Sequence, residues 1–352
     1  TEFCAVTAGH RMTPFKFIDL FAGIGGFHLA LQSLGGECVF ASEIDEKARS
    51  TYKQNHGMNP HGDIRAITAP DRPDNVIRTQ IPDHDILAAG FPCQPFSLAG
   101  VSARNALGQS HGLLDETQGT LFYDIARIVK IKKPKALLLE NVSNIVRHDG
   151  GKTFDVLKRV VEDLGYSLSW SVLNSETLVP QRRKRCFMVA FRDADMEEKM
   201  TFPDLSGDPI PLRTALEKDV DEKYTLSDRG WAGHQRRTAA NIARGTGFTA
   251  HTADLNRPSN TIVARYYKDG KECLIPQEGK NPRLLTPREC ARLQGFPDSF
   301  IPHPTRSAAY KQFGNAVPVP VVKAVAEAML VKLDEIESRE FGLGVTVANA
   351  KL

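Results

Sequence analysis

Short apolar segments alternate with helical segments between residues 15 and 142, and this alternation limits the possible folds more than any other feature. Four apolar runs have the length and composition of buried strands: FKFIDLF (15–21), CVFAS (38–42), DILAAG (85–90) and KALLLEN (135–141). Loops and helical patterns lie between these runs. Because parallel strands need crossover connections, such alternation is typical of a mostly parallel sheet with helices on both faces. We therefore expect an α/β fold.

Regular patterns also indicate how the rest of the chain is organised. A helix at 154–164 and strands near 167–173 and 186–191 complete a first domain that we place at 13–200. Residues 201–285 are rich in Pro, Gly, Arg and aromatic side chains with weak periodicity, which indicates a separate small domain. We expect a hinge region at 286–314. Residues 315–340 are expected to return to the first domain as a helix with one apolar face: Val322, Val325, Met329, Leu333 and Ile336.

Composition excludes several classes of protein. No apolar run approaches the roughly 18 residues that a membrane-spanning helix needs. The six cysteines are scattered without a Cys-x-x-Cys pair, which argues against a zinc site and a disulfide framework and fits a reducing cytoplasm. The formal net charge is only +3, yet residues 225–270 hold seven Lys or Arg against three acidic residues. Such a segment indicates either a polyanionic partner or a solvated basic surface.

The first strand is followed by a glycine-rich loop, DLFAGIGG, which opens a helix. Gly23, Gly25 and Gly26 allow a sharp turn and the close approach of a ligand to the backbone. Glu43 ends the next strand, where an acid can accept hydrogen bonds from both ribose hydroxyls. The spacing differs from the dinucleotide fingerprint, and no lysine provides a Walker-type phosphate site. The loop therefore indicates a nucleotide-like ligand or an ordinary strand–helix turn.

Three further side chains follow predicted strands or helices. Asp63 could accept a hydrogen bond from an adenine amino group or cap a helix. Cys93 lies between Pro92 and Pro95 after the third strand, where it could be a nucleophile or a small packed hydrophobe. Glu140 follows three leucines, so burial is expected to raise its pKa and favour a proton donor. The alternative for this residue is a helix-capping acid.

Basic and aromatic side chains occur in the remaining motifs. Arg183 and Arg185 are two residues apart before a strand, so both are expected to point to one side. They could hold a phosphate, brace an acid or simply form a basic turn. The Tyr266-Tyr267 pair beside Arg265 is either packed in a core or part of a nucleic-acid surface.

Taken together, these motifs resemble those of the DNA (cytosine-5)-methyltransferases over nearly the whole chain. They occur in the family's order: DLFAGIGG, SEID, GDI, GFPCQPFS, LLLENV, QRRKR, RLLTPRECARLQGFPDSF and AYKQFGNAV. The loop GVSARNALGQSHGLLDETQGTLF and the segment ARYYKDG resemble the bacterial branch typified by the Dcm and EcoRII methylases. The resemblance implies a Rossmann-like domain that binds S-adenosyl-L-methionine (SAM) and a smaller target-recognition domain at 201–285.

The resemblance also implies an activity and a role for each candidate catalytic residue. Cys93 would add to carbon 6 of a cytosine flipped out of the DNA duplex, and Glu140 would protonate or hydrogen-bond ring nitrogen 3. Arg183 and Arg185 would orient the acid and stabilise the adduct. The methyl group would pass from SAM to carbon 5, giving 5-methylcytosine and S-adenosylhomocysteine without a metal ion.

Binding residues follow from the same resemblance. The SAM pocket would be lined by Phe21, Gly23, Ile24, Gly25, Gly26, Glu43, Ile44, Asp63, Ile64, Pro92, Asn315 and Val317. The residues near DNA would be Gln94, Ser97, Arg244, Thr261, Arg265 and Tyr266. Two positions depart from the usual pattern, because Ile44 replaces a tryptophan that packs on adenine and Ala316 replaces a serine. We expect SAM affinity to be somewhat lower as a result.

The expected partner is double-stranded DNA that contains a short palindrome of the CC…GG type, methylated at one cytosine. The resemblance implies a monomeric, cytoplasmic enzyme of bacterial or phage origin, associated with the nucleoid through DNA and not with a membrane. Such an enzyme acts either beside a cognate restriction endonuclease in a restriction-modification system or alone.

Other classes account for fewer of these features. A nucleotide-dependent oxidoreductase would need the longer glycine fingerprint and would leave Cys93 and Glu140 unexplained. A binding-only relative should lack the nucleophile or the acid, and both are present. A methyltransferase that acts on transfer RNA keeps the same chemistry, but the sizeable recognition domain favours DNA.

Overall fold

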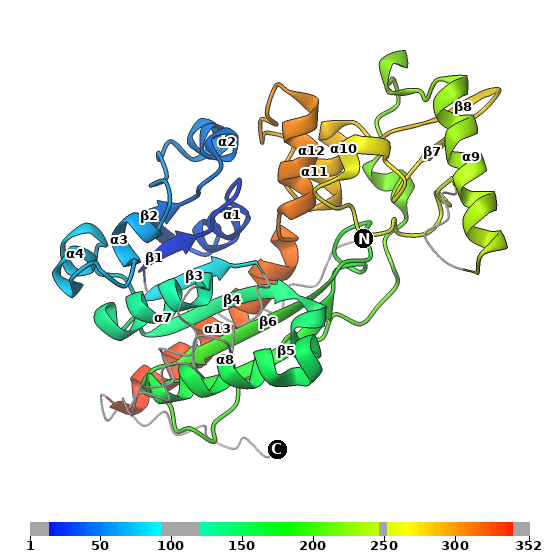
Figure 1. Cartoon of the computed structure of the whole chain (residues 1–352). Coiled ribbons are helices and arrows are strands. Elements are labelled where there is room, and N and C mark those ends of the chain that lie inside the picture. Colours follow the sequence, from blue (N-terminus) through cyan, green and yellow to red (C-terminus); the bar gives the residue numbers. More distant parts are fainter. Residues whose placement is uncertain (1–13, 93–119, 246–251, 341–352) are drawn as a thin grey trace, which may run out of the picture.

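A computed structural model of the chain describes residues 14–92, 120–245 and 252–340, and the structural statements below apply to these ranges. Six strands form a sheet in the order β2-β1-β3-β4-β6-β5 (Figure 1). They are β1 (Phe15–Leu20), β2 (Gly36–Ser42), β3 (Ile86–Gly90), β4 (Ala136–Val142), β5 (Ser167–Asn174) and β6 (Lys184–Phe191). β1 pairs in parallel with β2 and β3, β3 pairs in parallel with β4, and β6 runs antiparallel to both β4 and β5. The expected mostly parallel sheet is confirmed.

Helices cover both faces of the sheet, as predicted. On one face, Leu87 and Leu139 share a core with α3 (Arg65–Thr68), α4 (Asp74–Gln80), α7 (Leu121–Lys132) and α8 (Lys152–Asp163). On the other face, Ala88 and Leu138 share a core with α1 (Gly26–Gln32) and α13 (Val319–Glu340). Neighbouring residues of one strand point to opposite faces, and both faces are buried. This explains why the strands are continuous apolar runs.

The predicted C-terminal helix is confirmed as α13. Val322, Val325 and Met329 are fully buried, and the helix contacts α1 and β6. It begins at Val319 rather than at 315, because α12 (Arg306–Asn315) already includes residue 315. None of the helices in the described ranges is long and apolar enough to cross a membrane.

A second lobe, which we define as residues 201–315, lies beside the sheet (Figure 1). It contains η3 (Leu212–Ala215), η4 (Glu222–Tyr224), α9 (Asp228–Ala243), α10 (Tyr266–Asp269), β7 (Ile275–Gln277), β8 (Lys280–Arg283), α11 (Pro287–Leu293) and α12. Its core joins Leu212 and Ile275 with Leu293 of α11 and Phe313 of α12. Residues 286–314, predicted as a hinge region, therefore contain two helices that help to form this core.

Shorter connections complete the chain. α2 (Glu46–His56) follows β2 and contacts α12, so it links the sheet to the second lobe. Two short 3₁₀ turns, η1 (Ser143–Val146) and η2 (His148–Gly151), connect β4 to α8.

A buried ion pair stabilises the second lobe. Arg283 donates two hydrogen bonds of 2.8 Å to the Glu289 carboxylate. The same carboxylate accepts the backbone N–H groups of Thr286 at 2.8 Å and Glu217 at 2.9 Å. The Glu289 side chain is fully buried and that of Arg283 is 6% exposed. A charge at this depth is tolerated only while its partners remain in place.

Arg283→Met is expected to lower the free energy of unfolding by about 3–5 kcal/mol, because Glu289 would stay in the core without its guanidinium partner. Arg292→Ala is the matched control. Arg292 is more exposed than Arg283 and pairs with the exposed Asp298, so its loss should lower the free energy of unfolding by less than about 1 kcal/mol. Urea unfolding followed by circular dichroism measures both variants. Equal losses would contradict the role given to the buried pair.

Candidate active site

A cavity of about 640 Å³ opens at the edge of the sheet where the parallel strands end. Volumes of roughly 300–1,000 Å³ are usual for sites that bind small molecules. Its wall comes from the loops after β1, β2 and β3, from the end of β4, from the start of β6 and from the end of α12. All residues predicted to bind SAM except Gly25 line this cavity: Phe21, Gly23, Ile24, Gly26, Glu43, Ile44, Asp63, Ile64, Pro92, Asn315 and Val317. Glu140, Arg183 and Arg185 line it as well.

Steric contacts explain the glycines of the loop after β1. Gly25 has a φ of 87°, and a Cβ atom there would lie 2.1 Å from Nε2 of His56. The same nitrogen lies 3.0 Å from the Ile24 carbonyl oxygen, so His56 supports the loop. A Cβ atom at Gly26 would lie 2.6 Å from the Val317 side chain. Gly25 therefore shapes the loop without lining the cavity, and Gly26 allows the loop to pack on Val317.

Glu43 is held in the cavity wall by two backbone donors. The Gly23 N–H donates to Oε2 and the Asp45 N–H donates to Oε1, both at 2.8 Å. The carboxylate is thus fixed between the glycine loop and the start of α2, and it keeps lone pairs for further donors. Phe21, just before the loop glycines, has a φ of 55°, which is strained for a residue with a side chain. Such strain is common at ligand sites.

Asp63 and Ile44 form a more exposed part of the wall. Arg65 donates to the Asp63 carboxylate through Nε at 3.0 Å and Nη2 at 2.7 Å. These bonds hold the pKa of Asp63 below its ordinary value, so the carboxylate is ionised and can accept hydrogen bonds from a ligand. The Ile44 side chain is 63% exposed and offers an apolar contact.

Glu140, near the end of β4, forms a buried ion pair with Arg185. Nε of Arg185 lies 3.0 Å from Oε1 of Glu140, whose side chain is 9% exposed. Burial raises the pKa of Glu140 above its ordinary value, while the guanidinium groups of Arg185 and Arg183 oppose this rise. The acid therefore lies in the cavity wall with a pKa above that of an exposed glutamate, which suits a proton donor.

Arg183 has a different environment from its neighbour in the motif. Its Nη1 donates to the Ile262 carbonyl at 3.0 Å, and its Nη2 donates to the carbonyls of Gly314 at 3.0 Å and Ala316 at 2.9 Å. Burial lowers the pKa of Arg183 to about 9. Of the two arginines predicted to orient the acid, Arg185 therefore pairs with it directly, whereas Arg183 binds backbone at the second lobe and the turn that follows it.

Several residues of the cavity wall are absent from the sequence-based predictions, among them Asn141 and Lys311. Nδ2 of Asn141 donates to the Phe91 carbonyl at 2.7 Å and so ties the end of β4 to the chain after β3. Lys311 forms an ion pair of 2.6 Å with Asp45 at the start of α2. Asn141 directly follows the predicted acid in LLLENV, and this adjacency is a signal that could have identified it. Lys311 carries no comparable local signal.

The residues predicted to contact DNA fall into two groups. Cys93, Gln94 and Ser97 lie outside the described residues. Arg244 and Arg265 are exposed on the second lobe. Thr261 is partly exposed, and its hydroxyl donates to the Arg182 carbonyl at 2.5 Å.

The prediction that Tyr266 contacts DNA is wrong. Its side chain is fully buried, and its hydroxyl donates to the Cys273 carbonyl at 2.7 Å and accepts the Leu285 N–H at 2.9 Å. Tyr266 begins α10, which turns this ring into the core against Tyr310. The adjacent Tyr267 is 44% exposed, so it is the aromatic side chain of this pair that solvent reaches.

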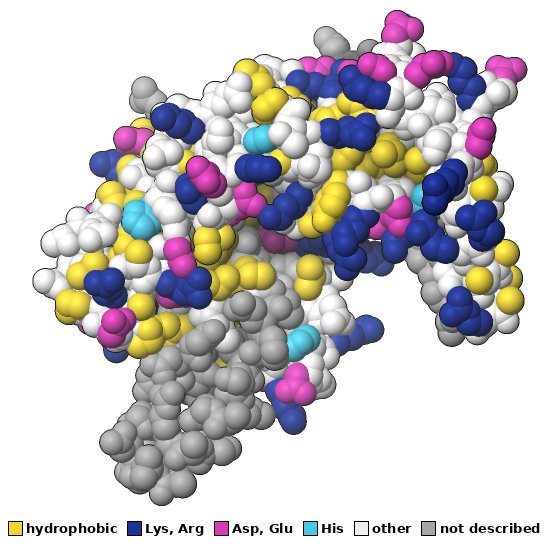
Figure 2. Space-filling view, turned by 45° about the horizontal axis from the view of Figure 1, so that its top comes forward, with side chains coloured by type: hydrophobic (Ala, Val, Ile, Leu, Met, Phe, Trp, Pro, Cys, Tyr) yellow, Lys and Arg dark blue, Asp and Glu magenta, His cyan; other side chains and the backbone are white. Residues whose placement is uncertain are grey.

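Basic side chains project from α9. Arg229, Arg236 and Arg237 are exposed, and Arg244 at its end is exposed as well. Within this fully described helix, His234 is the buried residue. Figure 2 shows Lys and Arg side chains gathered on the second lobe, around the projecting part at the right of the view. α9 therefore contributes little to the core and presents a basic surface.

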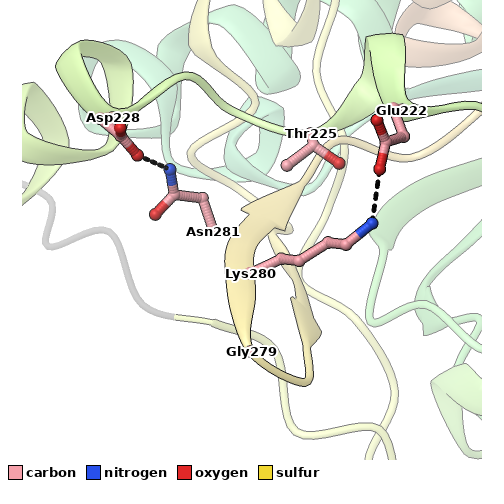
Figure 3. Close-up of a pocket in the computed structure, with 6 residues that line it drawn as sticks. All are labelled: Glu222, Thr225, Asp228, Gly279, Lys280 and Asn281. Carbon is pink, nitrogen blue, oxygen red and sulfur yellow. Dashed lines mark hydrogen bonds and ion pairs between the residues drawn. The ribbon is translucent and has the colours of Figure 1, made fainter.

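A second hollow lies on the second lobe, between β8 and the start of α9 (Figure 3). It is lined by Glu222, Thr225, Asp228, Gly279, Lys280 and Asn281. Lys280 pairs with Glu222, and Nδ2 of Asn281 donates to Asp228 at 2.7 Å. These groups satisfy one another, and the hollow contains none of the predicted site residues. Across the described ranges, no group of three or more His, Cys, Asp or Glu side chains is arranged to hold a metal ion.

Sequence comparisons with known proteins agree with this geometry. Residues 15–331 match the family described as C-5 cytosine-specific DNA methylase. The type II methyltransferase M.SsoII of Shigella sonnei is 47% identical over 325 residues, which cover 91% of this chain and 81% of that protein. The DNA-cytosine methyltransferase of Escherichia coli (strain K12) is 39% identical over 377 residues, which cover 93% of this chain and 80% of that protein.

Solved structures share the fold. The Dnmt2 methyltransferase of S. pombe superposes with a TM-score of 0.69 at 21% sequence identity, covering 92% of this chain and 100% of that chain. This likeness agrees with the SAM-dependent, Rossmann-like fold, and the resemblance to the family and its Dcm/EcoRII-type branch is confirmed. The chain belongs to the C-5 cytosine-specific DNA methylase family and is a DNA cytosine-5 methyltransferase.

Proposed function

We propose that the chain methylates carbon 5 of a cytosine in double-stranded DNA, with Cys93 as the nucleophile and Glu140 as the proton donor. The observation that carries the proposal is the position of Glu140. It is a buried acid, paired with Arg185, in the wall of the cavity that also contains Glu43 and the glycine loop. An acid with a raised pKa beside a cavity of cofactor size is suited to general acid catalysis at a methyl-transfer site.

The cavity residues fit SAM, the methyl donor that the family implies. Glu43, already held by two backbone N–H groups, retains lone pairs for the ribose hydroxyls. Asp63 is ionised and can accept a hydrogen bond from the adenine amino group, while Ile44 offers an apolar contact to the ring. When bound, SAM supplies an electrophilic methyl group.

Groups of the chain itself would activate the cytosine. The Cys93 thiolate forms a bond to carbon 6, and the displaced electron pair moves through the ring to nitrogen 3, which takes a proton from Glu140. Carbon 5 becomes nucleophilic and accepts the methyl group. Loss of the carbon 5 proton to a base then breaks the sulfur–carbon bond, and nitrogen 3 returns its proton to Glu140. Arg185 would hold the carboxylate in place through its ion pair of 3.0 Å.

The second lobe would bind the DNA. A cytosine inside a duplex has to be flipped out before it can enter the cavity. The exposed Arg244, Arg265 and arginines of α9 would contact phosphates, with Thr261 nearby, and residues 201–285 would read the sequence. Gln94 and Ser97, which flank the proposed nucleophile in sequence, would lie near the flipped base.

Resemblance to the Dcm/EcoRII-type branch supports a short palindrome of the CC…GG type as the recognition site. The type II relatives support a cognate restriction endonuclease in the same system. All the proposed catalytic residues belong to one chain, so we propose a monomer that acts on DNA in the cytoplasm.

Bisulfite sequencing of DNA from a methylation-free host that expresses the chain should show 5-methylcytosine at one position of one short palindrome. Cys93→Ser should abolish this signal while SAM binding persists, because a hydroxyl is a far weaker nucleophile than a thiolate. Near-normal methylation by the variant would refute Cys93 as the nucleophile. Modified transfer RNA together with unmodified DNA would show that the substrate is RNA.

Glu140→Gln should reduce the single-turnover rate roughly 100-fold with DNA affinity retained, because the amide keeps the shape but cannot deliver a proton. Burial raises the pKa of Glu140, and the protonated form is present below that pKa. The wild-type rate should therefore fall as pH rises through this pKa, and the variant should not show this fall. Rapid-quench methylation across pH measures both effects. An unchanged rate would make Glu140 structural.

A variant with Arg236→Gln and Arg244→Gln should weaken binding to all DNA sequences alike. The slope of log Kd against log salt concentration should be smaller by about 2 than in the wild type. The reason is that each phosphate contact releases about one counterion, and two contacts are lost. Arg159→Gln, an exposed position on α8, is the control and should leave the slope unchanged. Fluorescence anisotropy with a DNA duplex gives both slopes. If the double variant keeps the wild-type slope, the phosphate contacts lie elsewhere.

A further inference from the structure

Two buried side chains of one short segment join the second lobe to the cavity. Gln181 and Arg183 lie in QRRKR, directly before β6, and they are 0% and 2% exposed. The Ile262 N–H donates to Oε1 of Gln181 at 2.8 Å, and Nη1 of Arg183 donates to the Ile262 carbonyl at 3.0 Å. Both polar backbone groups of Ile262 are therefore bound by side chains from outside its lobe. Ile262 directly follows Thr261, one of the predicted DNA contacts.

Arg183 binds the turn after α12 at the same time. Its Nη2 donates to the carbonyls of Gly314 and Ala316, and both of these residues line the cavity. One guanidinium group thus holds three carbonyls from two separate segments. The rigid fork of an arginine permits this arrangement, whereas the single ammonium of a lysine does not reproduce it.

The backbones of these two segments are also in direct contact. A Cβ atom at Gly314 would lie 2.2 Å from the carbonyl carbon of Val263 and 2.4 Å from the nitrogen of Ala264. Nε2 of Gln181 donates to the Leu293 carbonyl at 3.0 Å, which anchors the same junction to α11. Such close packing opposes a shift of one segment without the other.

We propose that Gln181 and Arg183 are positioning residues that make residues 259–264 and 314–316 move as one unit. DNA bound at the first segment and SAM bound at the second would then strengthen each other's binding through this junction. The inference rests on the proposed function, because it takes DNA and SAM as the two ligands. Coupling between two ligands is reciprocal, so each should raise the affinity for the other by the same factor.

Calorimetry on the full chain tests the coupling, with S-adenosylhomocysteine in place of SAM to prevent turnover and a duplex that contains the site found by bisulfite sequencing. The Kd of S-adenosylhomocysteine is measured without DNA and with DNA. The ratio of the first value to the second should be about 10 in the wild type. In Arg183→Lys and in Gln181→Met this ratio should fall below about 2 whatever the affinity of the variant for S-adenosylhomocysteine alone, because the ratio compares two Kd values of the same variant. These variants keep the size of the side chain and remove the shared hydrogen bonds.

Arg182→Ala is the matched control within the same segment. Arg182 is exposed, and its Nη2 donates to Oδ1 of Asn260 at 2.8 Å, so this side chain contacts one of the two segments and does not bridge them. The variant should keep the wild-type ratio. If folded Arg183→Lys and Gln181→Met keep the wild-type ratio of the two Kd values, the proposal is overturned. A wild-type ratio near 1 would overturn it as well.

Hydrogen exchange of the wild type covers the case in which a variant does not fold. S-adenosylhomocysteine alone should slow exchange of the Ile262 amide by about 10-fold, because the ligand would stabilise the junction that holds this N–H. Unchanged exchange would overturn the proposal. This measurement needs no DNA, so it separates failure of the coupling from failure of the proposed DNA methylation.

Discussion

Parallel pairing of neighbouring strands is the constraint on which the site depends. Because β1, β3 and β4 run in the same direction, their carboxyl ends meet at one edge, and residues at or just after these ends line one cavity. Gly90 at the end of β3 lies opposite Glu140 in β4, and a Cβ atom there would lie 3.4 Å from Oε2 of Glu140. The end of β3 and the acid are therefore direct neighbours, where the chain continues toward Cys93.

Burial gives Glu140 its chemistry, and Arg185 limits the cost of that burial. The low polarity of the core favours the neutral carboxyl group and raises its pKa, while the guanidinium favours the charged form and opposes this rise. Arg183 serves another purpose although it lies only two residues away. It precedes the first residue of β6, and its guanidinium binds backbone carbonyls of two segments instead of the acid.

The second lobe shares its core with the proposed cofactor site. Ile24 of the glycine loop and Ala48 of α2 pack in the same cluster as Ile262 and Phe313. The segment that contains Thr261 and a cavity suited to SAM are therefore supported by one set of packed side chains. Close packing transmits displacement between such elements, which is why the junction at Gly314 is a reasonable place for coupling between the two ligands.

The α/β fold, the glycine loop, the strand-end acid and the final helix were determined by the sequence alone, because each depends on a local pattern of apolar runs, glycines or charges. The order of the motifs also identified the family. Only the tertiary structure decided which tyrosine of the adjacent pair is buried, which arginine contacts Glu140, that Lys311 lines the cavity and that Gln181 binds Ile262. These outcomes depend on contacts between distant residues, such as Arg183 with Gly314, and no local pattern encodes such contacts.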